Sequence, residues 1–112
     1  MLIPNADQAV IPAEKLRQYL LSRSHPVGRH KAAFFAGLGY TEAEWSRLES
    51  DLRIQHLDLN AEEVDATRYG RKFMITGTLN GPSASALLVS VWIIRTDEDV
   101  PRFVTAYPGV DR

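Results

Sequence analysis

The stretch Phe73-Met74-Ile75-Thr76-Gly77-Thr78-Leu79 decides the fold class, because its side chains alternate with a period of two. Residues 73, 75, 77 and 79 would share one face of a strand, and residues 72, 74, 76 and 78 the other. The turn signal Asn80-Gly81-Pro82-Ser83 follows directly. Leu87 to Ile94 is then almost continuously apolar, which predicts a central strand covered on both faces.

Two shorter segments complete the predicted sheet. Val64 to Thr67 reads as an edge strand, joined to the next strand by a tight turn at Tyr69-Gly70. Arg102 to Tyr107 reads as the last strand, and Pro108-Gly109 ends it. Strands that follow one another along the chain with short connections favour an antiparallel meander.

The first half of the chain shows helical spacing instead. Pro12 suits the first turn of a helix, and apolar residues follow it at intervals of three and four. A second helix is expected to begin near Val27 or Gly28 and to end at Gly37 and Gly39.

A third helix is predicted from Thr41 and Glu44, whose spacing is that of a capping box. We expect this helix to run to about Ile54, with His56 on the surface beyond it. The side opposite its apolar stripe carries the charged residues Glu42, Arg47, Glu49, Asp51 and Arg53.

These elements together predict an α+β fold, with N-terminal helices packed on one face of a small, roughly four-stranded antiparallel sheet. The chain reads as a single domain over residues 1–112, with a helical half at about 12–57 and a sheet half at about 63–108. Its 112 residues are 45% hydrophobic and 24% charged, which is an ordinary balance for a globular domain. We expect Trp92 to lie in the core.

The composition excludes several classes of protein. The chain has no cysteine, so it has neither disulfides nor thiolate zinc sites, and its three histidines match no common zinc spacing. We therefore expect no metal and no cofactor. There is no apolar run of about 20 residues and no signal-peptide pattern, so we expect no membrane contact and a cytoplasmic location.

Charge is unevenly distributed along the chain. The net charge is −1, which disfavours nonspecific binding to long nucleic acids. Residues 14–31, however, are predominantly basic, and residues 32–67 are predominantly acidic. The pattern fits either a local basic face that meets a short RNA segment or two solvated surfaces of opposite sign.

The segment His25-Pro26-Val27-Gly28-Arg29-His30-Lys31 gathers polar chemistry at an expected helix start. His30 is the candidate general acid or base, because imidazole titrates near neutral pH and helix starts attract phosphate. Lys31 is expected to act with it, and Arg29 to bind the anion. His25 is a further candidate for substrate binding, although capping of the loop is the simpler interpretation.

The predicted last strand contributes the second half of the candidate site. Thr105 and Tyr107 lie two residues apart and should project from one face together with Phe103. Their hydroxyls suit phosphate binding, with Thr105 assigned to catalysis and Tyr107 to substrate binding. Arg71, at the start of an earlier strand, is a candidate for additional positive charge. Ordinary packing and solvation remain the alternatives for each of these residues.

The segment from His25 to Ala32, the run Gly37-Leu38-Gly39-Tyr40 and the closing run Pro101 to Pro108 resemble a bacterial family of small domains of unknown function. This resemblance extends from about Pro4 to Gly109. More distantly, the order of helices followed by four strands resembles the barnase–colicin–RelE-type ribonuclease fold of bacterial toxins. That resemblance implies RNA as the substrate, although a fold alone does not define an activity.

Two functions follow as hypotheses. The first is a toxin-type ribonuclease that cleaves RNA without a metal and uses His30, Lys31 and Thr105. The second is a noncatalytic interaction module, such as an immunity-like protein, whose acidic stretch from Glu42 to Asp65 meets a basic cognate toxin or antitoxin partner. The sequence leaves the oligomeric state open, including a dimer paired through the edge strand near Val64.

Overall fold

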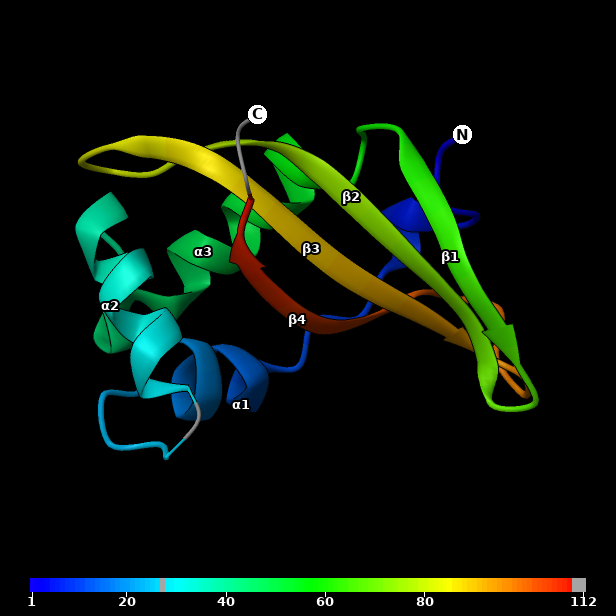
Figure 1. Ribbon diagram of the computed structural model, residues 1–112, viewed down its shortest axis with the longest axis horizontal. Coiled ribbons are helices and arrows are strands. Elements are labelled where there is room, and N and C mark those ends of the chain that lie inside the picture. Colours follow the sequence, from blue (N-terminus) through cyan, green and yellow to red (C-terminus); the bar gives the residue numbers. More distant parts are fainter. Residues whose placement is uncertain (27, 110–112) are drawn as a thin grey trace.

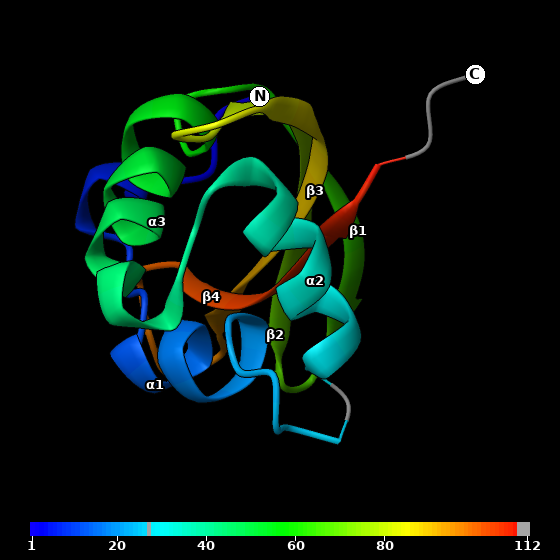
Figure 2. The ribbon, with the colours of Figure 1, turned by 90° about the vertical axis from the view of Figure 1, so that its left-hand side faces the viewer.

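The computed structural model describes residues 1–26 and 28–109. Four antiparallel strands form one sheet in the order β1-β2-β3-β4. The strands are β1 (Ala61–Thr67), β2 (Gly70–Asn80), β3 (Ser85–Arg95) and β4 (Arg102–Pro108). The helices gather on one side of this curved meander (Figures 1 and 2). The predicted α+β fold, with helices packed against an antiparallel sheet, is confirmed.

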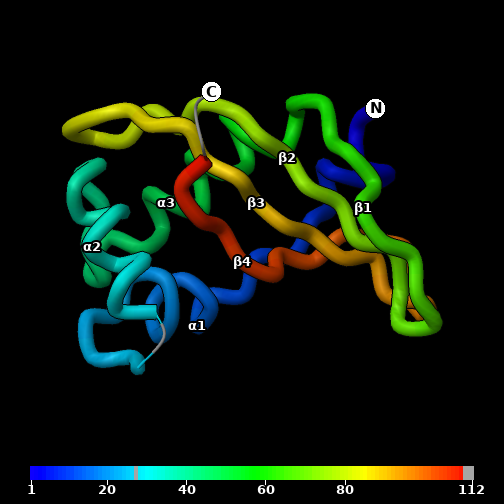
Figure 3. Tube along the Cα trace, in the orientation of Figure 1, coloured from blue at the N-terminus to red at the C-terminus, as the bar shows by residue number. Residues whose placement is uncertain are grey.

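The helical half contains three helical units. The first is α1 (Ala13–Lys15), which continues as the short π-helix η2 (Leu16–Leu20). The second is α2 (Arg29–Leu38). The third begins with η3 (Glu42–Glu44), continues as α3 (Trp45–Asp51) and ends with η4 (Leu52–His56). The tube in Figure 3 shows how these units follow one another before the chain enters β1.

The period-two pattern of β2 predicts its buried face correctly. Phe73, Ile75 and Leu79 are fully buried against the helices. In β3, Trp92 is also fully buried, and on the opposite face Val91 is only 8% exposed. An inner strand with both faces covered has little need for polar residues, which explains its apolar run.

The ends of α2 depart from the prediction in one respect. Gly39 does end the helix, since it adopts the left-handed conformation with φ 102°. Gly37, which was also expected to end it, lies inside the helix. At the other end Gly28 is the N-cap residue, whereas Val27 lies outside the described residues.

The third helical unit starts as predicted, because the Thr41 hydroxyl accepts a hydrogen bond from the Glu44 backbone N–H at 3.3 Å. The expectation that Asp51 lies on the charged outer face is wrong. Asp51 is 7% exposed and accepts hydrogen bonds from the Tyr40 hydroxyl (2.6 Å) and from Arg47 Nε (3.0 Å). These bonds satisfy a buried carboxylate that periodicity alone had assigned to solvent.

His56 was expected on the surface and is instead fully buried. Its Nδ1 lies 2.6 Å from Ser90 Oγ, and its Nε2 lies 3.2 Å from the Gly77 carbonyl oxygen. Trp92 Nε1 donates to the same Ser90 oxygen at 2.9 Å. A polar network therefore joins the end of the third helical unit to β2 and β3.

A register shift in β4 changes which residues share a face. Val91 pairs with Thr105, but Trp92 pairs with Phe103, so Val104 is an extra residue in β4. Phe103 therefore faces the core, in edge-to-face contact with Trp92, and Thr105 points to the opposite side. The expectation that Phe103 shares a face with Thr105 and Tyr107 is wrong, although Thr105 and Tyr107 do share one.

The N-terminal segment pairs with the start of the outer edge of β4. Val10 forms an isolated parallel bridge with Arg102, and its carbonyl accepts a hydrogen bond from the Phe103 N–H at 2.9 Å. Within residues 1–26 and 28–109, no helix combines the length and the apolar character that crossing a bilayer requires.

Candidate functional site

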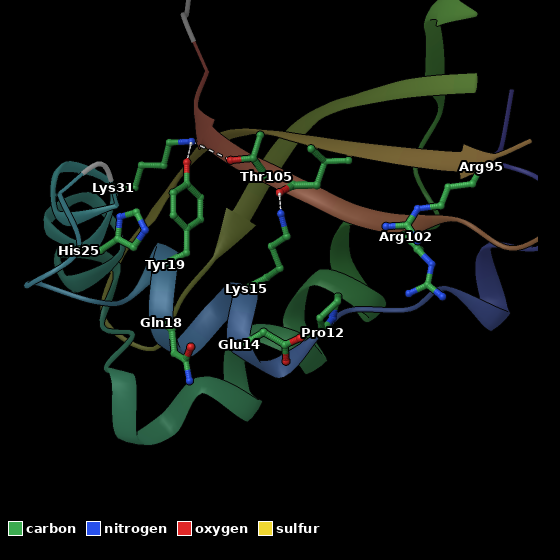
Figure 4. Close-up of a pocket in the computed structure, with 11 residues that line it drawn as sticks. Pro12, Glu14, Lys15, Gln18, Tyr19, His25, Lys31, Arg95, Arg102 and Thr105 are labelled. Carbon is green, nitrogen blue, oxygen red and sulfur yellow. Dashed lines mark hydrogen bonds between the residues drawn. The ribbon is translucent and has the colours of Figure 1, made fainter. Parts of the chain in front are cut away.

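A pocket of about 800 Å³ lies where the α1–η2 unit, the start of α2 and the edge of β4 meet. Figure 4 shows Lys31, Tyr19 and His25 at one end of this pocket, with Arg95 and Arg102 at the other. Its lining consists of Pro12, Glu14, Lys15, Gln18, Tyr19, His25, Lys31, Arg95, Arg102, Val104 and Thr105.

Lys31 is the centre of the hydrogen bonding in this pocket. Its ammonium nitrogen donates to the Tyr19 hydroxyl at 2.9 Å and to Thr105 Oγ1 at 2.7 Å. These two bonds tie α2 to the preceding helical segment η2 and to the last strand, β4, which is far away in the sequence. They also fix a cation beside two hydroxyls, as Figure 4 shows.

The cation changes the acidity of its neighbour. The hydrogen bond from Lys31 lowers the pKa of the Tyr19 phenol below its ordinary value, and Thr105 and the charge of Lys15 act in the same direction. Partial burial opposes this change. The net direction is a lower pKa for Tyr19, because hydrogen bonds and positive charge stabilise the ionised form.

The pocket is cationic as a whole. Its lining contains four basic side chains, Lys15, Lys31, Arg95 and Arg102, against the single carboxylate of Glu14. Lys15 also donates to the Val104 carbonyl at 3.4 Å. Glu98 partly offsets this charge from outside the lining, since it makes a bidentate ion pair with Arg102 at 2.8–3.1 Å. An anion would therefore meet net positive potential here.

His25 and Gly28 hold the start of α2 against η2. The backbone N–H of Gly28 donates to His25 Nδ1 at 2.9 Å, and the His25 ring packs edge-to-face on Tyr19. A Cβ at position 28 would lie 1.9 Å from the Tyr19 carbonyl oxygen, so only glycine permits this approach. The conformation of this segment thus places Lys31 over Tyr19.

The structure brings together only some of the residues that the sequence singled out. Lys31, Thr105 and His25 all line the pocket. His30 and Arg29 are exposed on the first turn of α2 and are not part of the lining among the described residues. The catalytic assignment of His30 stays a prediction.

The two remaining candidates lie elsewhere. Tyr107 projects from the same face of β4 as Thr105 and pairs with Val89. Among the described residues that line the pocket, Tyr107 is absent. Arg71 makes a bidentate ion pair with Glu63 across β1 and β2, at 2.8 and 3.1 Å, and lines a neighbouring hollow.

Sequence reasoning missed Tyr19, Lys15 and Arg102 as pocket residues. Tyr19 falls at the same helical spacing as the buried Leu16 and Leu20, and that spacing indicates the core. The available signal was the spacing of four between Lys15 and Tyr19, which places both on one side of a helix.

Within residues 1–26 and 28–109, there is no cluster of three or more histidine, aspartate or glutamate side chains that could bind a metal ion. The pocket instead offers ammonium, guanidinium and hydroxyl groups, a donor set that suits an oxyanion.

The structure is thus a small α+β domain with a cationic pocket. The chain belongs to the family described as a domain of unknown function, DUF6883, which matches residues 2–110. The resemblance of the sequence to a family of uncharacterised domains is thereby confirmed. A comparison with curated proteins gave no significant match.

A solved structure shares the fold. It is a chain of the contact-dependent growth inhibition toxin–immunity protein complex from Klebsiella pneumoniae 342, with a TM-score of 0.62 and 17% sequence identity. The similarity covers 89% of the present chain and 99% of that chain. At this identity the finding concerns the architecture of the domain.

Proposed function

We propose that this domain is a toxin-type endoribonuclease that cleaves RNA by general acid–base chemistry in the Lys31 pocket. The observation that carries the proposal is the Lys31 ammonium, which bridges the Tyr19 phenol and the Thr105 hydroxyl in a cationic pocket. Such a site combines a charge for the phosphodiester with groups that transfer protons. The shared fold with a chain from a toxin–immunity protein complex supports a toxin-related role.

Cleavage of RNA by its own 2′-hydroxyl needs a base, an acid and a cation near the phosphorus. In the proposed reaction the Tyr19 phenolate takes the proton of the 2′-hydroxyl, and the 2′-oxygen attacks phosphorus. The bond to the 5′-oxygen then breaks as Lys31 gives that oxygen a proton. The products carry a 2′,3′-cyclic phosphate and a 5′-hydroxyl.

The same pair can return to its starting state without another residue. After the reaction Tyr19 holds the proton that it took from the 2′-hydroxyl, and Lys31 lacks the one that it donated. Their oxygen and nitrogen are 2.9 Å apart, so the proton crosses directly from the phenol to the amine. The lowered pKa of Tyr19 favours this transfer.

The remaining pocket residues bind the substrate in this proposal. Thr105 accepts a hydrogen bond from Lys31, which holds the ammonium in place for a phosphate group of the substrate. His25 lines the pocket as a substrate-binding residue, and its Nδ1 accepts the hydrogen bond from the Gly28 backbone N–H, so that atom is not assigned as the base. Lys15 and Arg102 contribute positive charge.

The test is incubation of the protein with a defined RNA, followed by mapping of the product ends. Lys31→Met keeps the length of the side chain and removes its charge, and should slow cleavage by about 10²- to 10³-fold. Lys72→Met is the matched control, because Lys72 lies on β2 outside the pocket lining. Absence of cleavage by the unmodified protein, or full activity in Lys31→Met, would reject the proposal.

His30→Ala tests the assignment made from the sequence. If the Lys31–Tyr19 pair performs both proton transfers, His30→Ala retains activity, in keeping with the exposed position of His30. Loss of cleavage in a folded His30→Ala protein would instead assign a proton transfer to His30.

One observation supports a second candidate function. The structural neighbour comes from a complex that contains both a toxin and an immunity protein. A noncatalytic immunity-like module would use its exposed acidic residues, which include Glu42, Glu44 and Glu62, to bind a basic partner. In that case Glu42→Lys would weaken binding of the cognate toxin, and Lys31→Met would leave it unchanged.

A further inference from the structure

The turn between β1 and β2 presents an aromatic ring to solvent. Tyr69 is 65% exposed, and it is the one aromatic residue among the large exposed hydrophobic side chains of residues 1–26 and 28–109. The Arg68 guanidinium lies 4.9 Å from the ring centroid and donates to the Tyr69 hydroxyl at 2.8 Å. Arg68 therefore covers one face of the ring, and the exposed area leaves the other face accessible.

Several contacts hold this turn in place. The Thr96 backbone N–H donates to the Tyr69 carbonyl at 3.1 Å, and its hydroxyl donates to the Arg68 carbonyl at 2.6 Å. Gly70 has φ 149°, and a Cβ there would lie 2.3 Å from the Ile94 carbonyl oxygen. These hydrogen bonds hold the turn against the end of β3, and they fix the backbone that carries the Tyr69 ring.

The turn is continuous with the Lys31 pocket through Arg95. Arg95 pairs with Gly70 in the sheet register, so it lies directly beside the turn. The same residue lines the Lys31 pocket, at the end away from Lys31, and also lines the neighbouring hollow that includes Gly70 and Arg71 (Figure 4). A strand of RNA that leaves the pocket past Arg95 would run toward the turn that carries Tyr69.

We infer that Tyr69 and Arg68 form a base-stacking subsite for single-stranded RNA, several nucleotides from the phosphate that is cleaved. This inference rests on the proposed ribonuclease function and adds the substrate class, which is an unpaired strand longer than a dinucleotide. Unpaired bases stack on aromatic rings and on guanidinium planes, whatever their sequence. Arg95 would hold a phosphate between this subsite and the pocket.

The test measures binding of a labelled single-stranded 12-nucleotide RNA by fluorescence anisotropy, in a Lys31→Met background in which cleavage is slow. Tyr69→Ala is expected to weaken binding by about fivefold or more, and Tyr69→Phe to retain most of it, since the ring remains. Ile54→Ala is the matched control, because Ile54 is an equally exposed apolar residue (69%) outside both hollows. Binding in Tyr69→Ala equal to that of the control would overturn the subsite.

Two further measurements separate this inference from the proposed function. Arg95→Gln should reduce the slope of log Kd against log salt by about 0.7, the value for one phosphate contact on a single strand. With active protein, Tyr69→Ala should lower the ratio of 12-nucleotide to dinucleotide kcat/KM by about fivefold or more. An unchanged ratio rejects the subsite while dinucleotide cleavage still supports the ribonuclease. Absence of any cleavage rejects the ribonuclease itself.

Discussion

Lowering the pH from 6.5 to 5.5 is expected to destabilise the domain through His56. The Trp92 indole donates to Ser90 Oγ, so the single Ser90 hydroxyl proton is directed to His56 Nδ1. The proton of the neutral ring then lies on Nε2 and is donated to the Gly77 carbonyl. A second proton on the ring would oppose the Ser90 proton inside the core.

The direction of the effect follows from burial. Burial lowers the pKa of His56 below its ordinary value of 6.5, and backbone hydrogen bonding to Gly77 and Leu88 opposes this only in part. The unfolded chain therefore binds a proton at a higher pH than the folded chain does. The stability from His56 is complete above pH 6.5 and declines below it, until the pH reaches the pKa of the folded state.

The size of the effect follows from the linkage relation. A histidine that protonates only in the unfolded state lowers the free energy of unfolding by about 1 kcal/mol between pH 6.5 and 5.5, which is the upper limit for His56. For a domain of 112 residues this corresponds to a fall in Tm of roughly 4 °C. Thermal unfolding followed by circular dichroism at several pH values measures it.

His56→Gln should remove this part of the pH dependence, and His30→Gln, which changes an exposed histidine, should leave it in place. An identical fall in Tm between pH 6.5 and 5.5 in the unmodified protein and in His56→Gln would refute the reasoning. If His56→Gln does not fold, imidazole NMR signals of the unmodified protein provide the second test. A His56 ring that becomes charged at pH 6.5 would equally refute it.

Three further changes have defined outcomes. Asp51→Ala leaves the buried Tyr40 hydroxyl without its acceptor and should lower the free energy of unfolding by about 1–3 kcal/mol, measured by urea denaturation. Gly28→Ala places a Cβ 1.9 Å from the Tyr19 carbonyl oxygen and should lower both Tm and RNA cleavage, because α2 must shift and carries Lys31 with it. An unchanged Tm would show that the close approach is relieved at no cost. Glu98→Gln removes the anionic partner of Arg102 and should strengthen RNA binding, with a steeper salt dependence. Weaker binding in Glu98→Gln would contradict a cationic binding surface.

The sheet was predictable because its pattern reflects burial directly. The alternation around Phe73 and the apolar run around Trp92 follow from the covered face of β2 and from the two covered faces of β3. The polar residues in the core were not predictable in this way. Asp51 is hydrogen-bonded to Tyr40, eleven residues away, and His56 is hydrogen-bonded to Ser90, thirty-four residues away. No local sequence pattern predicts either hydrogen bond.

The candidate site was predictable in part for a related reason. Lys31 and Thr105 stood out as a basic residue at a helix start and a hydroxyl on an edge strand, and the structure joins them. Tyr19 was not singled out, because a tyrosine at helical spacing with leucines indicates a core position. The extra residue at Val104 reverses the face of Phe103, and a bulge of this kind has no reliable sequence signal.

The most direct test of the central claim is a double-mutant cycle on Tyr19 and Lys31, measured as the single-turnover rate constant for cleavage of a defined RNA. Tyr19→Phe keeps the ring that contacts His25 and removes only the hydroxyl, and should slow cleavage by about 10²- to 10⁴-fold. If the two groups exchange protons as one unit, the double variant is no slower than the slower single variant. The claim would be contradicted if the rate losses of the two single variants multiplied fully in the double variant. It would also be contradicted if the Tyr19→Phe protein cleaved at the unmodified rate.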